Sequence, residues 1–296
     1  MSLTPYYQSK DLRFNLLQGD SMELLPRLKH RFDMVFADPP YFLSNDGLSI
    51  QNGQIVSVNK GDWDKPKDAD HVLAFNRQWL SLLRPCLKDN GTVWISGTMH
   101  NIFAVGMALG ELGYKILNIV TWEKTNPPPN FSCRYLTYST EQILWARKSP
   151  KVPHYYNYDL MKRLNGDKQM RDVWRLPAIA PWEKTCGKHP TQKPLSVLTR
   201  LILASTRPDA WILDPFAGSS TTGIAANLAN RRYVGLDLQT EYLDMGKQRR
   251  QEIEDPVTAA TYRAKIAGFS PQIPLKSYLS EESMTPYDHP PVPLEW

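Results

Sequence analysis

Apolar residues recur with two different periods along this chain of 296 residues. Short apolar runs predict buried strands, and they lie at 14–17, 33–37, 92–96, 114–122, 141–146, 211–214 and 232–237. Apolar residues at helical spacing predict helices over 21–28, 68–87, 99–112, 195–205 and 241–253. Ser21 is the expected cap of the first helix, and Val72, Phe75, Trp79 and Leu83 form a stripe that we assign to the core.

The order of these elements indicates the fold class. Strands and helices alternate through both halves of the chain, which predicts a Rossmann-like α/β fold, a mostly parallel twisted sheet with helices on both faces. Residues 42–67 are rich in Gly, Asn, Ser and Asp and predict a long loop. Residues 251–296 are expected to be poor in regular structure because of their prolines, which are Pro271, Pro274, Pro286, Pro290, Pro291 and Pro293.

The segment Asp38-Pro39-Pro40-Tyr41 follows the predicted strand over 33–37. Two consecutive prolines fix φ twice and remove two backbone N–H donors. The segment keeps one carboxylate, bare carbonyls and one aromatic ring, which together can hold an amino group and stack on the ring that carries it. An adenine flipped out of a duplex fits this description. A stiff strand-to-loop turn ending in tyrosine is the alternative.

A second motif runs from Trp211 to Gly223 and combines a buried strand, a turn of small residues and the start of a helix. Residues 219–221 (Ser-Ser-Thr) can cap this helix, whose free N–H groups then face an anion, and Gly218 permits close approach of a ligand. The next strand ends in Asp237, placed for ribose hydroxyls, which is the layout of a nucleotide-binding half. The missing Gly-x-Gly-x-x-Gly spacing disfavours a dinucleotide, and a generic βαβ unit is the alternative.

The two motifs together resemble the beta class of DNA adenine-N6 methyltransferases, in which Asp-Pro-Pro-Tyr precedes Asp-Pro-Phe-Ala-Gly-Ser. Gly19-Asp20 with Leu24-Leu25, the strand at 90–95 and the His-Pro-Thr-Gln-Lys-Pro element at 189–194 are similar to further parts of that family. This resemblance covers roughly residues 15–250. It implies the class I methyltransferase fold in permuted motif order, S-adenosylmethionine as methyl donor, no metal, and double-stranded DNA as substrate. The chain length and the long tail are similar to solitary methyltransferases of the YhdJ type.

The resemblance also implies roles for individual residues. The catalytic set is Asp38, Pro39, Pro40 and Tyr41: the Asp38 side chain and the Pro39 carbonyl accept from the N6 amine, and Tyr41 stacks on the flipped base. The cofactor site is expected to comprise Asp20, Asp38, Lys193, Asp214, Phe216, Ala217, Gly218, Ser219, Ser220, Thr221 and Asp237. For Asp20, a plain acid at a helix N-terminus is the alternative. The family often has Glu at the position of Asp237, which is one methylene shorter.

Charge placement suggests where DNA binds. The net charge is +5, yet residues 146–193 contain eleven Lys or Arg and four acids, interleaved with tyrosines and tryptophans. Basic residues among aromatics suit a phosphate backbone and exposed bases. The expected DNA-binding residues are Lys162, Arg163, Lys168, Arg171 and Arg175. A solvated loop surface is the alternative.

These observations divide the chain into a catalytic half (1–146), a target-recognition segment (147–188), a cofactor-binding half (189–254) and a Pro-rich extension (255–296) that packs on the body, covers DNA or pairs subunits. Dimers are common in the family, so a homodimer is an open alternative. Three scattered cysteines suit a reducing compartment. Without an apolar run near 18 residues or a secretory signal at the start, the chain is expected in the cytoplasm, on the nucleoid when bound to DNA, and not in a membrane.

Rival functions differ in identifiable residues. The closest rival is a cytosine-N4 DNA methyltransferase, whose members more often have Ser where this chain has Asp38. An RNA or protein-glutamine methyltransferase would have Asn at this position or place the cofactor motif first. A DNA-binding module without enzymatic activity would not need the nucleotide-binding half.

Overall fold

One large sheet forms the centre of the molecule. The computed structural model describes residues 3–42, 48–51, 54–57, 68–130, 133–187, 189–269 and 273–279. Within them, nine strands lie in the order β1 (Tyr7–Gln8), β2 (Phe14–Gln18), β11 (Arg232–Asp237), β10 (Trp211–Asp214), β3 (Phe32–Ala37), β6 (Leu87–Gly97), β8 (Thr140–Arg147), β7 (Lys115–Lys124) and β9 (Val173–Leu176). Every predicted strand is therefore present in this sheet.

The sheet is parallel from β2 through β6, and β8 runs antiparallel to both of its neighbours. Its central strands are buried on both faces, which explains why their sequences are continuously apolar rather than alternating. Strand β10 pairs with β3 through Ile212 opposite Met34 and Leu213 opposite Val35. The chain passes from β3 toward β6 on one side and from β10 toward β11 on the other, so the order of strands reverses between β3 and β10.

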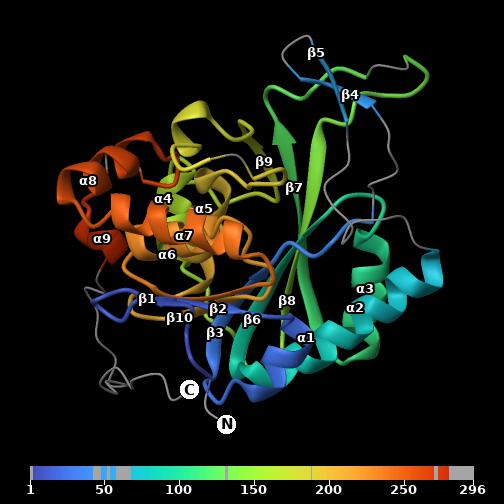
Figure 1. Ribbon diagram of the computed structural model, residues 1–296, viewed down its shortest axis with the longest axis horizontal. Helices are drawn as coiled ribbons and strands as arrows, with labels where there is room; N and C mark the ends of the chain where they lie inside the picture. The colour runs from blue at the N-terminus through green and yellow to red at the C-terminus, as the bar shows by residue number, and fades with distance from the viewer. Residues whose placement is uncertain are drawn as a thin grey trace.

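Helices cover both faces of the sheet (Figure 1). One face carries α1 (Ser21–Leu24), α2 (Ala69–Leu83) and α3 (Ile102–Glu111). The other carries α4 (Tyr158–Leu164), α5 (Leu195–Ser205), α6 (Thr221–Leu228), α7 (Thr240–Glu252), α8 (Pro256–Lys265) and α9 (Lys276–Leu279). Two apolar cores result, one on each face, and Trp79 of the predicted stripe is fully buried in the first of them. The predicted α/β class is confirmed.

Prolines and caps explain where some elements begin and end differently from the prediction. Ser21 does not cap α1: the Asp20 carboxylate accepts the Met22 N–H at 2.8 Å, and Ser21 is the first helical residue. Pro26 directs the chain after α1 into a 3-10 turn. Pro85 does the same after α2, so this helix ends at Leu83 and β6 begins at Leu87.

Several regular elements occur where a loop or no element was predicted. Residues Leu48–Gln51 (β4) and Gln54–Ser57 (β5) pair antiparallel, so the loop prediction over 42–67 was wrong for them. Apolar and polar residues alternate next to Asn52-Gly53, a two-residue turn sequence, and this overlooked pattern is typical of a β-hairpin. Residues 43–47, 52–53 and 58–67 lie outside the described part of the chain. The short elements α4 and β9, between β8 and α5, were not predicted.

The C-terminal segment packs on the body of the protein as far as it is described. Helix α8, ten residues long, corrects the expectation that this segment is poor in regular structure, while residues 280–296 lie outside the described range. Tyr262, Ile266 and Tyr278 belong to the same apolar core as α5 and α6. The buried Arg231 donates to the Tyr278 carbonyl at 2.5 Å, and this hydrogen bond connects α9 to the body of the protein.

Gly223, in the first turn of α6, permits this helix to pack closely on the sheet. A Cβ at this position would lie 2.4 Å from the Tyr233 ring and 2.5 Å from the Phe14 ring, whereas a Cβ on Gly110 of α3 would have nothing within 4 Å. Because overpacking a tight core is costly, we expect Gly223→Ala to lower the free energy of unfolding by about 1–3 kcal/mol.

The matched substitution Gly110→Ala should instead raise it by up to about 1 kcal/mol, since alanine favours a helix. Urea denaturation followed by circular dichroism measures both changes. Equal effects of the two substitutions would show that helix propensity, and not close packing, governs Gly223.

Candidate active site

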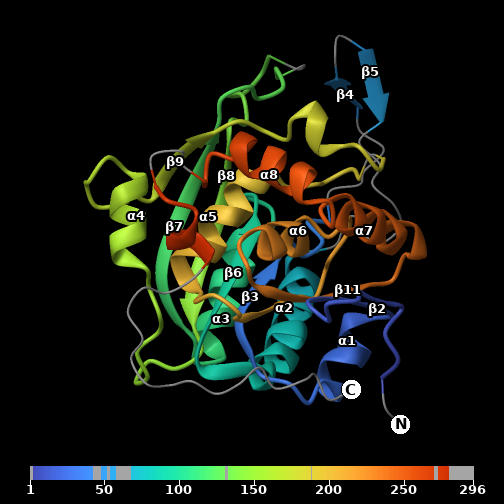
Figure 2. The same cartoon turned by 90° about the vertical axis from the view of Figure 1, so that its left-hand side faces the viewer.

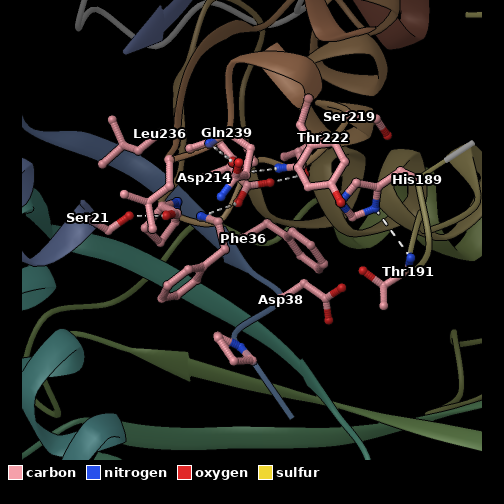
Figure 3. A pocket seen from close by; sticks show the side chains of 18 of the residues that line it. Ser21, Phe36, Asp38, His189, Thr191, Asp214, Ser219, Thr222, Leu236 and Gln239 are labelled. Carbon is pink, nitrogen blue, oxygen red and sulfur yellow. Dashed lines mark hydrogen bonds between the residues drawn. The ribbon is translucent and has the colours of Figure 1, made fainter. Parts of the chain in front are cut away.

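A pocket opens at the carboxyl ends of β3, β10 and β11, where the strand order reverses. Ligands of open α/β sheets bind at such a switch point. Asp38 follows β3 and Asp214 ends β10, so the pairing of these strands brings both carboxylates to one pocket. Figure 3 shows both facing the cavity, together with His189 and Thr222.

Asp214 is buried at the base of the pocket. Its Oδ1 accepts the Phe216 N–H at 3.1 Å and its Oδ2 accepts the Thr222 hydroxyl at 2.5 Å. Burial raises the pKa of Asp214 to about 7, and the nearby charges of Asp38 and Asp237 act in the same direction. These carboxylates are therefore close enough to repel one another, and a cation in the pocket would relieve that repulsion.

Asp237 orders the turn that forms the adjoining wall. Its Oδ2 accepts the Gly218 N–H at 2.7 Å and its Oδ1 accepts the Gln239 N–H at 2.9 Å. Burial raises the pKa of Asp237. Each carboxylate oxygen can accept a second hydrogen bond, so Asp237 keeps acceptor capacity for hydroxyl groups of a ligand.

Gly218 and His189 form a close contact on the same wall. Gly218 has φ +49°, and a Cβ there would lie 2.9 Å from the His189 ring. Burial lowers the pKa of His189 to about 4, so the ring is neutral near pH 7. Its Nδ1 accepts the Thr191 N–H at 3.3 Å, which leaves the ring proton on Nε2.

A buried arginine stabilises the turn that precedes α6. The Arg249 guanidinium of α7 donates to the Ser219 carbonyl at 2.7 Å and to the Thr221 hydroxyl at 2.8 Å. Ser220 has a left-handed backbone (φ +58°), and its side chain lies against Gly246 instead of the pocket. The turn thus presents backbone, Ser219 and Thr221 to the cavity.

Asp38 belongs to a buried cluster of charges on the opposite wall. The Lys193 ammonium donates to Asp38 Oδ2 at 2.5 Å and lies 3.6 Å from Glu141 Oε2. Glu141 Oε1 accepts from Lys124 at 2.6 Å. The four side chains carry two negative and two positive charges, so the cluster is balanced, as a buried charged group requires.

The electrostatics of this cluster favour its charged form. Burial lowers the pKa of Lys193, but the carboxylates of Asp38 and Glu141 more than reverse this and leave it well above its usual value. Burial likewise raises the pKa of Glu141, and the ammonium groups of Lys193 and Lys124 overcome that effect and lower it. Lys193 and Glu141 are therefore both ionised near neutral pH.

Tyr41 joins the cluster through its hydroxyl. It donates to Asp38 Oδ1 at 2.5 Å, lies 3.1 Å from the Ser96 hydroxyl and accepts from Lys193 at 3.3 Å. The Tyr41 side chain is buried and does not line the pocket. Burial raises the pKa of Tyr41 well above its usual value, so the hydroxyl keeps its proton. Both Asp38 oxygens thus accept a hydrogen bond from a neighbour.

Most of the predicted cofactor residues meet in this pocket. It is lined by Asp20, Asp38, Lys193, Asp214, Phe216, Ala217, Gly218, Ser219, Thr221 and Asp237, and of the predicted set only Ser220 is turned away. Pro40 of the predicted catalytic segment also lines it, whereas Pro39 and Tyr41 are not among its lining residues. Asp20 caps α1 and also lines the pocket.

None of the predicted DNA-binding residues lines the pocket. Asn157, the cap of α4, donates its N–H to the Ala204 carbonyl near the end of α5, while Lys193 precedes the start of that helix. The eleven residues of α5 separate these points by about 16 Å. Lys162 and Arg163 lie in the last turn of α4, beyond this cap, and Lys168 and Arg171 lie in the exposed segment between α4 and β9. Arg175 of β9 lies nearer, 3.5 Å from Glu123 of β7.

Several residues of the site carried no assigned role in the sequence analysis. His189, Glu141 and Arg249 lie outside the two motifs, whereas Thr222 lies within the second one. Thr222 could have been inferred, because it directly follows the predicted cap residues. Glu141 and Arg249 could not, because only the folding of β8 and α7 against the motif turns brings them into contact.

Among the described residues, no group of three or more His, Cys, Asp or Glu side chains is arranged to hold a metal ion. None of the described helices has the length and apolar character needed to cross a membrane.

Comparisons with known proteins agree with this geometry. A model of the DNA methylase family matches residues 32–248. The type II methyltransferase M2.MboI of Moraxella bovis is 57% identical over 267 residues, 90% of this chain and 97% of that protein. The type II methyltransferase M2.DpnII of Streptococcus pneumoniae is 55% identical over 247 residues, 83% of this chain and 91% of that protein.

Solved structures share the fold. The complex of M1.HpyAVI with SAM has a TM-score of 0.62 and 26% identity, over 80% of this chain and 98% of that one. The cytosine-N4-specific PvuII DNA methyltransferase has a TM-score of 0.64 over 83% of this chain and 89% of that one, and at 18% identity it supports the fold alone. The predicted methyltransferase fold is confirmed.

The raised pKa of Asp214 predicts a pH-dependent stability. The folded protein retains a proton on Asp214 up to about pH 7, whereas the unfolded chain releases it near its ordinary pKa of 3.8. The folded state thus binds more protons between these values, and stability falls as the pH rises through them. We expect the free energy of unfolding of Asp214→Asn to decrease less over this pH range than that of the wild type, by up to about 4 kcal/mol.

Urea unfolding of the wild type and the variant at about pH 4.5, 6 and 8 measures how the free energy of unfolding depends on pH in each protein. Asp172→Asn, on an exposed acid, is the control and should leave the slope unchanged. Parallel curves for wild type and Asp214→Asn would mean that Asp214 is ionised throughout.

Proposed function

Because the chain belongs to the DNA methylase family, we propose that it transfers a methyl group from S-adenosylmethionine to the exocyclic N6 of an adenine flipped out of double-stranded DNA. The observation that carries this proposal is the adjacency of β3 and β10, which opens Asp38 and the Asp214–Asp237 wall onto one pocket. Donor and target base can then lie side by side.

The residues of the pocket fit S-adenosylmethionine, which supplies an electrophilic methyl group on a positively charged sulfur. Asp20, Asp214 and Asp237 line the pocket, while His189 is neutral and the charge of Asp38 is paired with that of Lys193. Asp237 retains acceptor capacity for ribose hydroxyls. The N-terminus of α6, with Ser219 and Thr221, suits the methionine carboxylate. The bare face of Gly218 permits close approach.

Catalysis requires that the adenine N6 become a better nucleophile. Its lone pair is delocalised into the ring, and acceptors placed out of the ring plane favour a pyramidal nitrogen that regains the pair. The Asp38 carboxylate and the Pro39 carbonyl are the acceptors for this role. Aiming fixed charge at the transition state is usually the largest catalytic contribution, and holding the reacting atoms in near-attack geometry adds to it.

Lys193 acts on the reaction through Asp38, as a positioning residue. Its ammonium at 2.5 Å fixes the orientation of the carboxylate, and Glu141 with Lys124 fixes Lys193 in turn. Since the cluster is neutral as a whole, the negative charge that faces the target amine is compensated within the protein. The methylated ammonium is acidic and releases its proton to water.

Tyr41 cannot hydrogen-bond to Asp38 and stack on the flipped base at the same time. Its hydroxyl occupies Asp38 Oδ1 in this structure, and its ring does not line the pocket. To stack on the flipped base, the ring must move toward the pocket, and this movement releases Oδ1 for the N6 amine. Arrival of the base thus exchanges one donor to Asp38 for another.

Adenine is favoured over cytosine as the target because the resemblance places Asp38 where cytosine-N4 enzymes more often have Ser. The cytoplasm, and the nucleoid when the protein is bound to DNA, are the expected location. A homodimer, the four-part division of the chain and the similarity to the YhdJ type all stay predictions.

A direct test is to incubate the protein with S-adenosylmethionine and plasmid DNA and to sequence the product for modified bases. We expect N6-methyladenine within one short recurring sequence. N4-methylcytosine would establish the rival target, and unmodified DNA would contradict the proposal.

Asp38→Ala should reduce methyl transfer by about a thousandfold or more, because it removes the acceptor of the target amine. Binding of S-adenosylmethionine, measured by calorimetry, should change little. Circular dichroism verifies the fold, since the variant leaves Lys193 without its closest partner. Retained methyl transfer would end the assignment of Asp38.

The basic segment should contribute to DNA affinity by neutralising phosphates. Replacement of four cations by serine is expected to weaken DNA binding and to reduce the slope of log Kd against log salt by about 0.9 for each phosphate that no longer has a cation beside it. The substituted residues are Lys162, Arg163, Lys168 and Arg171.

A control variant removes the same charge from the amino ends of the strands, at Arg27, Lys29, Arg31 and Lys115. It should leave the salt slope unchanged in fluorescence anisotropy titrations. The same slope for both variants would show that the basic segment is not the DNA face. Arg175→Ser, measured alone, reports on the cation nearest to the pocket.

A further inference from the structure

We propose that residues 133–139, here named the β7–β8 tip, enter the DNA duplex at the target site and that Leu136 fills the space left by the flipped adenine. The inference rests on the proposed function and adds to it the protein surface that keeps the duplex open. The basic segment after β8 has no part in it.

The tip is joined to the catalytic cluster by two strands of the sheet. Strand β7 ends at Lys124 and β8 begins at Thr140, so the tip leaves and re-enters the sheet beside the pocket. Glu141, the second residue of β8, lies 3.6 Å from Lys193, and Lys193 holds Asp38. Figures 1 and 2 show the connection projecting from the same end of the sheet as the β4–β5 hairpin.

The tip exposes an unusual amount of apolar surface. Leu136 is 90% exposed, more than any other large apolar side chain among the described residues, and Tyr135 and Tyr138 are each 57% exposed. The two tyrosine rings lie with their centroids 5.4 Å apart. Burying a leucine side chain that is otherwise in water is favourable, so a partner that covers Leu136 gains affinity from it.

The charge of the connection favours DNA as this partner. Residues 125–139 contain Arg134 and no Asp or Glu, so no acid opposes approach to phosphates. Three consecutive prolines, Pro127, Pro128 and Pro129, restrict the backbone of the segment that follows β7. A stiff segment loses less conformational entropy when the tip binds a partner.

Base flipping supplies the reason for an apolar group at this place. Extruding a base sacrifices its pairing and stacking and leaves a gap in the duplex. Apolar side chains inserted between bases offset such a cost in other DNA-binding proteins. Leu136 has a suitable size and exposure, and the tyrosines beside it can stack on the unpaired partner base.

The test compares two substrates that differ in the work of opening the duplex. One is a duplex with the methylated sequence found by modified-base sequencing, and the other has an abasic site opposite the target adenine, which is then unpaired. We expect Leu136→Ala to lower kcat/KM about tenfold or more on the intact duplex and less than about twofold on the abasic one. Phe103→Ala, on an apolar side chain of α3 that is 72% exposed, should change neither value.

A second measurement reports the opening itself. With 2-aminopurine as the target base, the rise in fluorescence on mixing with the wild-type protein should be smaller with Leu136→Ala. Equal loss of activity on both substrates, or no loss on either, would overturn the proposal. So would a shift of Leu136→Ala toward smaller oligomers in size-exclusion chromatography, because the tip would then contact a second copy of the chain.

Failure of this inference is distinguishable from failure of the proposed function. A wild-type protein that methylates neither duplex contradicts the function. A wild-type protein that methylates both, with Leu136→Ala equally active on both, contradicts only the role of the tip. An unchanged melting temperature of Leu136→Ala shows that the substitution leaves the fold intact.

Discussion

The parallel pairing of β3 with β10 is the constraint on which this molecule depends. These strands come from opposite halves of the chain, and nearly 180 residues separate Asp38 from Asp214. Their backbone hydrogen bonds nonetheless bring both carboxyl ends to one edge of the sheet. Since the order of strands reverses between them, the connections leave in opposite directions and the pocket stays open. The chemistry of the site needs this geometry, whichever half comes first in the sequence.

Charge is distributed differently over the two sides of that pocket. On the wall formed by Asp214 and Asp237, acids predominate, and burial, with a smaller contribution from the neighbouring carboxylates, raises the pKa of Asp214. On the side of the target base, Asp38 is compensated by Lys193, and Glu141 by Lys193 and Lys124. The first arrangement favours a cationic ligand, while the second leaves no net charge beside a neutral base. Both follow from burial, which makes an unpaired charge costly.

Parts of the chain outside the two motifs support the site in distinct ways. Helices α8 and α9 extend the core on the face that carries α5 and α6. Arg249 of α7 supports the turn before α6 from within. The connection between β7 and β8 reaches outward from the strands that carry Lys124 and Glu141. The protein therefore uses one sheet both to assemble the reacting groups and to present a surface to the duplex.

Much of the fold and of the pocket was predictable from local sequence, because burial and turn chemistry leave periodic signals. The bounds of α5 and β11 match the prediction residue for residue, and the motif residues Asp38, Asp214, Gly218 and Asp237 all line the pocket. The helix ends at Leu24 and Leu83 differ from the prediction, although Pro26 and Pro85 already contained the reason.

Tertiary structure alone decided the pairing of β3 with β10, the contact of Lys193 with Asp38 and Glu141, the support of Ser219 by Arg249 and the turning of Ser220 away from the pocket. These contacts join residues far apart in the chain or depend on one backbone angle. Periodicity reports whether a residue is buried; which partner it meets is set by the packing of whole elements.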